Sequence, residues 1–233
     1  MNTASFLLLI VLFFQIGAKA DTLFYGGDFD PNNPNANGLA NENDAIVHGD
    51  PYGAATYQNF VVSSGQSWNV TGLFSDDFMF TLNPKTAYWE IRSGVSEGNS
   101  GTLLASGTGN DTVTLINYYY DFGDYKNLVS GLNVTLGPGT YWFAVVPQAR
   151  DQQGRSFNVN TFGLNAIGTQ ISDKQFFNSP FFNTNFTNAD NIAVYPTFSS
   201  GVDGTVVPEP ASIVIFASGV MAAVAAGRRK MRL

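Results

Sequence analysis

The 233-residue chain contains no cysteine and only one histidine, His48. Without cysteine it has no disulfide framework, and stability must come from core burial. One histidine and no thiolate cannot supply the three protein ligands of a usual zinc site. His48 is also the only histidine that could activate a nucleophile, and no G-x-S-x-G motif is present. We therefore expect His48 to be an ordinary turn or surface residue, and the protein not to be an enzyme.

Basic residues are also scarce in the body of the chain. Residues 21–207 carry 17 acidic and 6 basic side chains, a net charge of −11. Such a surface repels nucleic acid phosphates, so no nucleic acid partner is expected. Sustained apolar stripes with helical spacing are missing outside the two termini, so little helix is expected in the body.

The body instead shows short alternating or β-branched runs separated by Gly, Asn, Asp and Pro, with 44% hydrophobic and 14% aromatic residues in the whole chain. This pattern predicts an all-β fold, a single β-sandwich or jelly-roll domain over residues 21–198. The clearest pair of strands is 132–136 and 141–146, joined by a turn at Gly137-Pro138-Gly139, with the second central and the first nearer an edge. Further strands are expected at 22–25, 56–63, 66–74, 78–82, 87–93, 102–106, 112–117, 157–162 and 192–198.

Two stretches of the body are candidate ligand sites. In GGDFDPNNPNANG, the side chains of Asp28, Asp30 and Asn32 recur at every second residue, and oxygen ligands at this density suit a structural Ca²⁺ ion. The alternative is a loop whose Asx side chains cap its own backbone. No other cofactor is expected.

Aromatic residues offer the second candidate. Tyr118, Tyr119 and Tyr120 cannot all face inward on one strand, so this run is a candidate platform for stacking sugars. Trp89 and Trp142 lie in strands typical of a core, and we assign them to packing.

Paired carboxylates for glycoside hydrolysis are less favoured than sugar binding, with Glu42, Glu90 and Glu97 among the candidates. In the run AYWEIRS, Tyr88, Glu90 and Arg92 are expected on one face of a strand, because side chains alternate between faces.

The N-terminus resembles a secretory signal peptide over residues 1–20. An apolar run at 6–16 precedes Ala18-Lys19-Ala20, an A-x-A-type site, so signal peptidase would cut before Asp21. The alternative is an uncleaved N-terminal membrane anchor.

The C-terminus has three parts. Residues 211–227 carry no charge and would span about 25 Å as a helix, near the lower limit for a bilayer core. A basic cluster follows, expected on the cytoplasmic side. Two prolines flank Glu209 just before the apolar run and hold it extended outside the helix. The Gly-rich segment 199–206 is expected to be a flexible linker.

This arrangement resembles the PEP-CTERM sorting signal of Gram-negative exported proteins, also called the ice-binding protein C-terminal domain. Ice binding does not carry over, since the regular Thr ladder of a flat ice-binding face is absent. The resemblance implies recognition by an exosortase, a membrane cysteine transpeptidase, over residues 207–233. The sorting motif would be Val207, Pro208, Glu209 and Pro210, and the basic tail Arg228, Arg229, Lys230 and Arg232.

The body, through runs such as GLNVTLGPGTYWFAVVP, is similar to the β-sandwich bodies of such proteins. The resemblance implies an exported protein, held in the inner membrane by its C-terminal helix until processing and then placed at the cell surface or outside the cell. We expect a structural or adhesive role in exopolysaccharide or biofilm. The alternatives are a carbohydrate-binding module, with or without Ca²⁺, and, less favoured, a glycoside hydrolase.

Overall fold

The computed structural model describes residues 20–43, 53–80, 84–119, 121–148, 155–194 and 197–208. These residues form thirteen β-strands and one short 3₁₀ helix, η1 (Ala189–Asn191), and no α-helix. No helix among them is long and apolar enough to cross a membrane. The predicted transmembrane helix at 211–227 and residues 1–19 of the predicted signal peptide at 1–20 lie outside the described residues.

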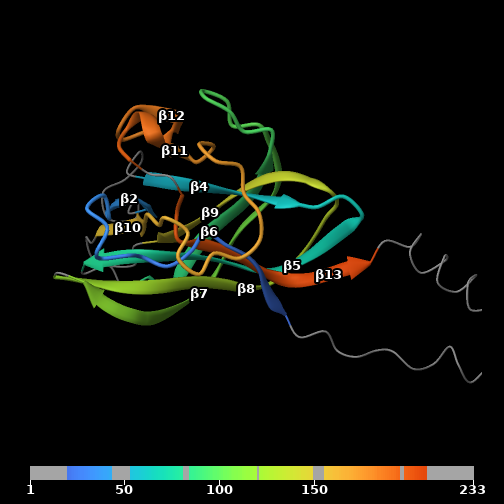
Figure 1. Cartoon of the computed structure of the whole chain (residues 1–233), viewed down its shortest axis with the longest axis horizontal. Coiled ribbons are helices and arrows are strands. Elements are labelled where there is room, and N and C mark those ends of the chain that lie inside the picture. The colour runs from blue at the N-terminus through green and yellow to red at the C-terminus, as the bar shows by residue number, and fades with distance from the viewer. Residues whose placement is uncertain are drawn as a thin grey trace, which may run out of the picture.

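The strands form one connected, almost entirely antiparallel sheet (Figure 1). Only β3 and β9 pair in parallel. Across the sheet the order is β1 (Asp21–Tyr25), β13 (Ser200–Pro208), β5 (Gln66–Phe80), β8 (Phe122–Leu136), β7 (Thr102–Tyr119), β6 (Thr86–Ser93), β9 (Gly139–Gln148), β3 (Glu42–Asn43), β4 (Gly53–Val62), β11 (Phe176–Ser179) and β12 (Thr184–Asn188). Off this path, β10 (Arg155–Val159) pairs with β5 and with β2 (Gly38–Ala40).

The sheet turns back on itself at β7. Residues 111–119 of this strand pair with β8, whereas residues 102–110 pair with β6. The two halves of the sheet therefore enclose a common apolar core. Phe60 of β4 stacks on Trp68 of β5 at 5.5 Å between ring centroids, and Phe143 of β9 meets Phe24 of β1 edge-on at 6.3 Å. Fully burying a side chain of this size contributes about 2–3 kcal/mol.

The all-β class predicted from the sequence is confirmed, in the form of a large mixed sheet. Several strands are longer than predicted. Residues 66–74 and 78–80, the described part of the predicted strand 78–82, belong to one strand, β5, and residues 102–106 and 112–117 belong to β7. The polar and small residues between the predicted pieces stay extended because the neighbouring strands pair with them. The predicted strand at 192–198 was wrong over its described residues: 192–194, 197 and 198 lie between η1 and β13, and among them only Phe198 forms an isolated bridge.

The strands around Gly137-Pro138-Gly139 form as predicted, but they are not hydrogen-bonded neighbours. The first pairs with β5 and the second lies between β6 and β4. The turn therefore carries the chain from one half of the sheet to the other. This arrangement places Leu136 and Phe143 in the shared core from opposite sides.

The flexible linker predicted at 199–206 was also wrong. Most of this segment is β13, which pairs with β5 along its length and with β1 near its start. Its glycines allow close packing rather than flexibility. A Cβ atom on Gly201 would lie 2.2 Å from the Phe74 ring, and one on Gly204 would lie 2.3 Å from the carbonyl oxygen of Asn69.

Candidate functional site

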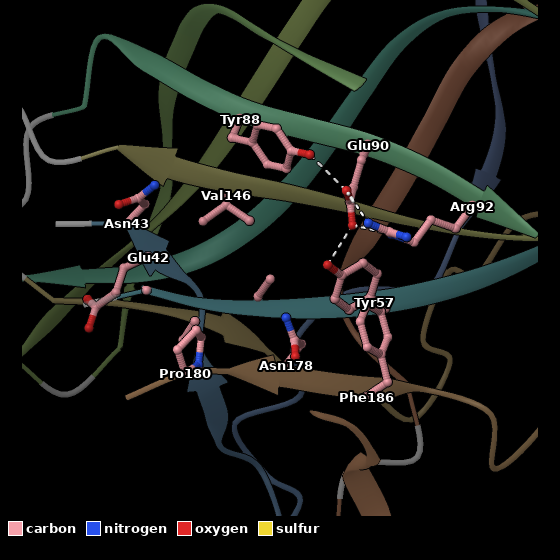
Figure 2. Close-up of a pocket in the computed structure, with 13 residues that line it drawn as sticks. Glu42, Asn43, Tyr57, Tyr88, Glu90, Arg92, Val146, Asn178, Pro180 and Phe186 are labelled. Atoms are coloured by element: carbon pink, nitrogen blue, oxygen red, sulfur yellow. Dashed lines mark hydrogen bonds and ion pairs between the residues drawn. The ribbon is translucent and has the colours of Figure 1, made fainter. Parts of the chain in front are cut away.

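A pocket of about 280 Å³ lies on the outer face of the sheet formed by β4, β6 and β9 (Figure 2). The strands β11 and β12 extend the sheet past β4 (Figure 1), and they contribute Asn178 and Phe186 to the pocket. Side chains that face away from the main core make the base of the pocket, because residues on a strand alternate between its faces. The lining includes Tyr57 from β4, Glu90 from β6 and Phe186 from β12.

A buried ion pair forms one end of the pocket. The Glu90 carboxylate is only 2% exposed and is bound by two arginine contacts, with Arg92 Nε 2.6 Å from Oε1 and Nη2 3.0 Å from Oε2. The Tyr57 hydroxyl donates to Oε1 at 2.5 Å, and the Tyr88 hydroxyl donates to Oε2 at 2.8 Å. Arg92 also lies over the Phe186 ring, 5.4 Å from its centroid.

The electrostatics of this network favour a fixed charge pair. Burial raises the pKa of Tyr57 well above its usual value, and the Glu90 charge raises it further. Hydrogen bonding to Glu90 likewise raises the pKa of Arg92. Burial also raises the pKa of Tyr88. Both tyrosines therefore stay protonated as donors, and Arg92 stays charged.

The second carboxylate of the pocket lies at its other end (Figure 2). Glu42 Oε1 is 2.7 Å from Arg155 Nε, and Glu42 Oε2 accepts the Ser156 backbone N–H at 2.7 Å. Glu97, the third glutamate considered for hydrolysis, instead accepts the Asn188 backbone N–H at 2.6 Å. The structure thus gives each glutamate its own partner, and hydrolysis by a carboxylate pair stays a prediction.

Between the two ends, the pocket offers a neutral polar group and aromatic surface. Asn178 of β11 points toward the cavity between Tyr57 and Pro180 (Figure 2). Tyr88 is half-buried and leaves part of its ring accessible. Amide groups and aromatic rings of this kind bind small polar ligands that have one apolar face.

The predicted calcium residues lie in the loop after β1, where Asp28 and Asp30 accept hydrogen bonds from the protein itself. Asp28 accepts the Tyr25 hydroxyl at 2.9 Å and the Asn165 amide at 2.6 Å. Asp30 Oδ1 accepts the backbone N–H of Asn32, an Asx turn. Among the described residues, no three Asp, Glu, His or Cys side chains are grouped to hold a metal ion. Calcium binding at Asp28, Asp30 and Asn32 stays a prediction.

The tyrosine run divides between surface and core. Tyr118 is 65% exposed near the end of β7. The Tyr119 ring instead packs against the rings of Phe29 and Phe78, with centroids 4.8 Å and 6.1 Å apart, respectively. Tyr120 lies outside the described residues. Sugar stacking at this run stays a prediction, resting on Tyr118. Trp142 is buried as expected, and Trp89 packs against the main core.

Sequence reasoning missed a set of buried aspartates along β5 and β8. Asp77 is fully buried and accepts hydrogen bonds from Ser75 at 2.5 Å, from Asn127 at 2.8 Å and from Asn41 at 2.9 Å. Burial nevertheless raises its pKa to about 7. The signal in the sequence was the SDDF run, two adjacent acids that are the only charged residues of the strand.

Two further members of this set lack a full complement of partners. Asp76 accepts hydroxyl hydrogen bonds from Tyr25 and Ser199, both 2.8 Å, and burial raises its pKa to about 6. Asp124 has no hydrogen bond to Oδ1. Its pKa rises to about 8, first through burial and then through the negative charges of Asp76, Asp77 and Asp28.

The first and the last strand of the described body lie next to the predicted processing sites in the sequence. β1 starts at Asp21, directly after the exposed Ala20, while Ala18 lies outside the described residues. Val207 and Pro208 end strand β13, with Ser67 and Gln66 as their Cα partners. The other residues of the predicted motif and the basic tail, Glu209, Pro210, Arg228, Arg229, Lys230 and Arg232, lie outside the described residues.

The family model of the PEP-CTERM protein-sorting motif matches residues 206–230. The chain carries a PEP-CTERM sorting motif. This motif supports an exported protein targeted to an exosortase, with a cell-surface or extracellular location. No curated protein matches the chain. The PEP-CTERM motif begins inside the folded body, since its first three residues belong to β13.

Proposed function

We propose that this PEP-CTERM protein is a non-enzymatic component of the cell surface or extracellular matrix, with a structural or adhesive role in exopolysaccharide or biofilm. Signal peptidase removes residues 1–20, the apolar run 211–227 holds the protein in the inner membrane, and an exosortase then processes the tail. The observation that carries this proposal is the sorting motif at residues 206–230, placed directly after an all-β body.

Substitutions in the sorting signal test this delivery route. We expect Glu209→Gln, and separately Arg228→Ala with Arg229→Ala, to leave unprocessed protein in the membrane fraction. Immunoblots of membrane, surface and medium fractions would measure this, in strains with and without an exosortase. Lys174→Ala, an exposed basic residue of the body, is the control and should be processed normally. Normal release of both tail variants would overturn the proposal.

The non-enzymatic part of the proposal is supported by the charge pairing in the pocket. Glu90 is neutralised by Arg92 and Glu42 by Arg155, so neither carboxylate is available as a free general base. Retaining and inverting glycosidases need two carboxyl groups within about 5–10 Å of each other across the scissile bond. Glu42 and Glu90 lie at opposite ends of the pocket (Figure 2), and each is already held by its own arginine, which weighs against their acting as such a pair.

A second candidate function is carbohydrate binding in the same pocket. The half-buried Tyr88 ring and the Asn178 amide face one cavity, and a volume of about 280 Å³ suits one sugar residue or the end of a chain. Such a site would let the protein hold exopolysaccharide directly, which is compatible with an adhesive role.

A glycan array on the purified processed protein tests this candidate. We expect binding to be lost in Asn178→Ala and kept in Asn133→Ala, an exposed residue on β8 in the other half of the sheet. Repeating the array with EDTA tests the predicted Ca²⁺. EDTA-sensitive binding that both variants keep would move the site to the loop at Asp28, Asp30 and Asn32. Absence of binding to any glycan would remove the candidate.

A further inference from the structure

The strand that leads into the sorting motif is held unevenly along its length. Its first part is fixed between two strands, because β1 pairs with residues 201–204 while β5 pairs from the other side. Val202 is fully buried in the main core. Gly201 and Gly204 are packed so closely that a Cβ atom at either position would overlap a neighbour. This root of β13 cannot leave the sheet without disrupting the core.

The tip of the strand, residues 205–208, is held much more weakly. Among the described residues its only strand partner is β5, since the pairing with β1 stops at Gly204. Val206 and Val207 are 45% and 41% exposed. Pro208 has no backbone N–H to donate to β5. Strand ends with few buried contacts open locally at a small fraction of the global free energy of unfolding.

The position of the motif creates a steric problem for the processing enzyme. Pro208 is paired in the sheet, and only Glu209 and Pro210 separate it from the apolar run at 211–227. Three peptide steps span at most about 10 Å, so the folded body sits close to the membrane. Proteases bind substrates as extended strands through main-chain hydrogen bonds, and the β5 side of Val207 and Pro208 is already occupied.

We infer that the tip of β13 must separate from β5 before the exosortase can process the protein, with the root at Gly204 as the point where the opening stops. Opening of residues 205–208 frees the β5-facing side of Val207 and Pro208. It also adds about 14 Å of extended chain between body and membrane. The pairing of Gln66 and Ser67 with the motif thus controls the rate of processing. This inference rests on the proposed function, because it takes exosortase processing as given.

A disulfide that locks the tip tests the inference. Ser67 and Val207 are Cα partners on adjacent antiparallel strands, within the usual reach of a disulfide, and the chain has no other cysteine. We expect full-length Ser67→Cys with Val207→Cys to accumulate as precursor under oxidising conditions. Addition of dithiothreitol to the cells should restore processing. Pulse-chase immunoblots would follow precursor and product, and thiol labelling would confirm that the bond has formed.

Three controls separate the lock from other effects. Each single cysteine variant shows whether the substitution itself, in particular at Val207 of the motif, slows processing. Ser93→Cys with Thr102→Cys places the same kind of bond between β6 and β7, far along the sheet path, and should be processed like the wild type. Insertion of Gly-Ser-Gly-Ser between Thr205 and Val206 keeps the matched motif, residues 206–230, intact but moves it out of the sheet, and should speed processing.

The outcomes are distinct. A formed Ser67–Val207 bond with unchanged processing, or an insertion that does not speed it, would overturn the inference and leave the proposed function intact. Wild-type processing that does not depend on an exosortase would instead refute the proposed function itself.

Discussion

At the scale of single residues, the Glu90 network contributes both to stability and to the shape of the pocket. A carboxylate that is 2% exposed needs a full set of partners, because burying an unpaired charge costs several kcal/mol. Arg92 and two tyrosine hydroxyls provide them. Neutralising Glu90 leaves Arg92, whose side chain is 16% exposed, without its counterion.

We predict that Glu90→Gln lowers the free energy of unfolding by about 3 kcal/mol, the usual cost of breaking a buried ion pair. Urea denaturation at neutral pH would measure this. Glu97→Gln is the matched control: Glu97 is exposed and accepts one backbone N–H, so its loss should cost under about 1 kcal/mol. Equal losses in the two variants would mean that the network does not stabilise the fold.

Part of this network could be read from the sequence. Strand alternation predicted that Tyr88, Glu90 and Arg92 share a face, and all three line the pocket. The local pattern could not supply Tyr57 or Phe186, because these residues lie on other strands and reach Glu90 and Arg92 only through the register of β4 and the return of β12. Contacts of this kind depend on pairing between distant segments, which a single sequence does not encode locally.

At the scale of elements, strand existence was easier to predict than strand extent. The alternating run at 87–93 matches β6 within one residue. The eighteen residues of β7 include Gly107, Gly109 and Asn110, which break strand patterns in isolation. They remain extended because β6 pairs with them. Partners across the sheet override local propensity there.

In the segment before the sorting motif, pairing across the sheet also overrides local composition, and here the effect bears on processing. Its glycines and serines are typical of a tether, yet the backbone approaches Phe74 and Asn69 so closely that no side chain would fit at Gly201 or Gly204. Composition cannot distinguish glycine that permits motion from glycine that permits contact. The consequence is that the sorting motif begins in a sheet rather than in a free chain.

At the scale of the whole molecule, negative charge inside the sheet adds to negative charge on the surface. The body carries a net charge of −11 from its residues. Four of its aspartates have raised pKa values in the folded state: Asp76 about 6, Asp77 about 7, Asp111 about 7 and Asp124 about 8, with burial the leading cause for each. An unfolded chain would titrate them near 4. Between about pH 4 and about pH 8, the folded protein therefore binds more protons than the unfolded chain.

Stability should consequently be highest in mild acid and fall with rising pH. A group whose pKa is raised on folding stabilises the fold below its unfolded pKa, and this contribution is lost as the pH passes through the folded pKa. For these aspartates the loss extends from about pH 4 to about pH 8. Thermal unfolding followed by circular dichroism should therefore give a higher Tm at about pH 5 than at about pH 9.

Asp124→Asn provides the decisive comparison, because asparagine resembles the protonated acid and Asp124 has both the highest pKa and an Oδ1 atom without a hydrogen bond. We expect this variant to raise Tm at about pH 9 and to change it little at about pH 5, which flattens the pH dependence. Asp173→Asn, at an exposed position, should leave the wild-type profile unchanged. A wild-type Tm that rises from about pH 5 to about pH 9 would show that the buried aspartates do not govern stability, since paired carboxylates would then dominate the titration.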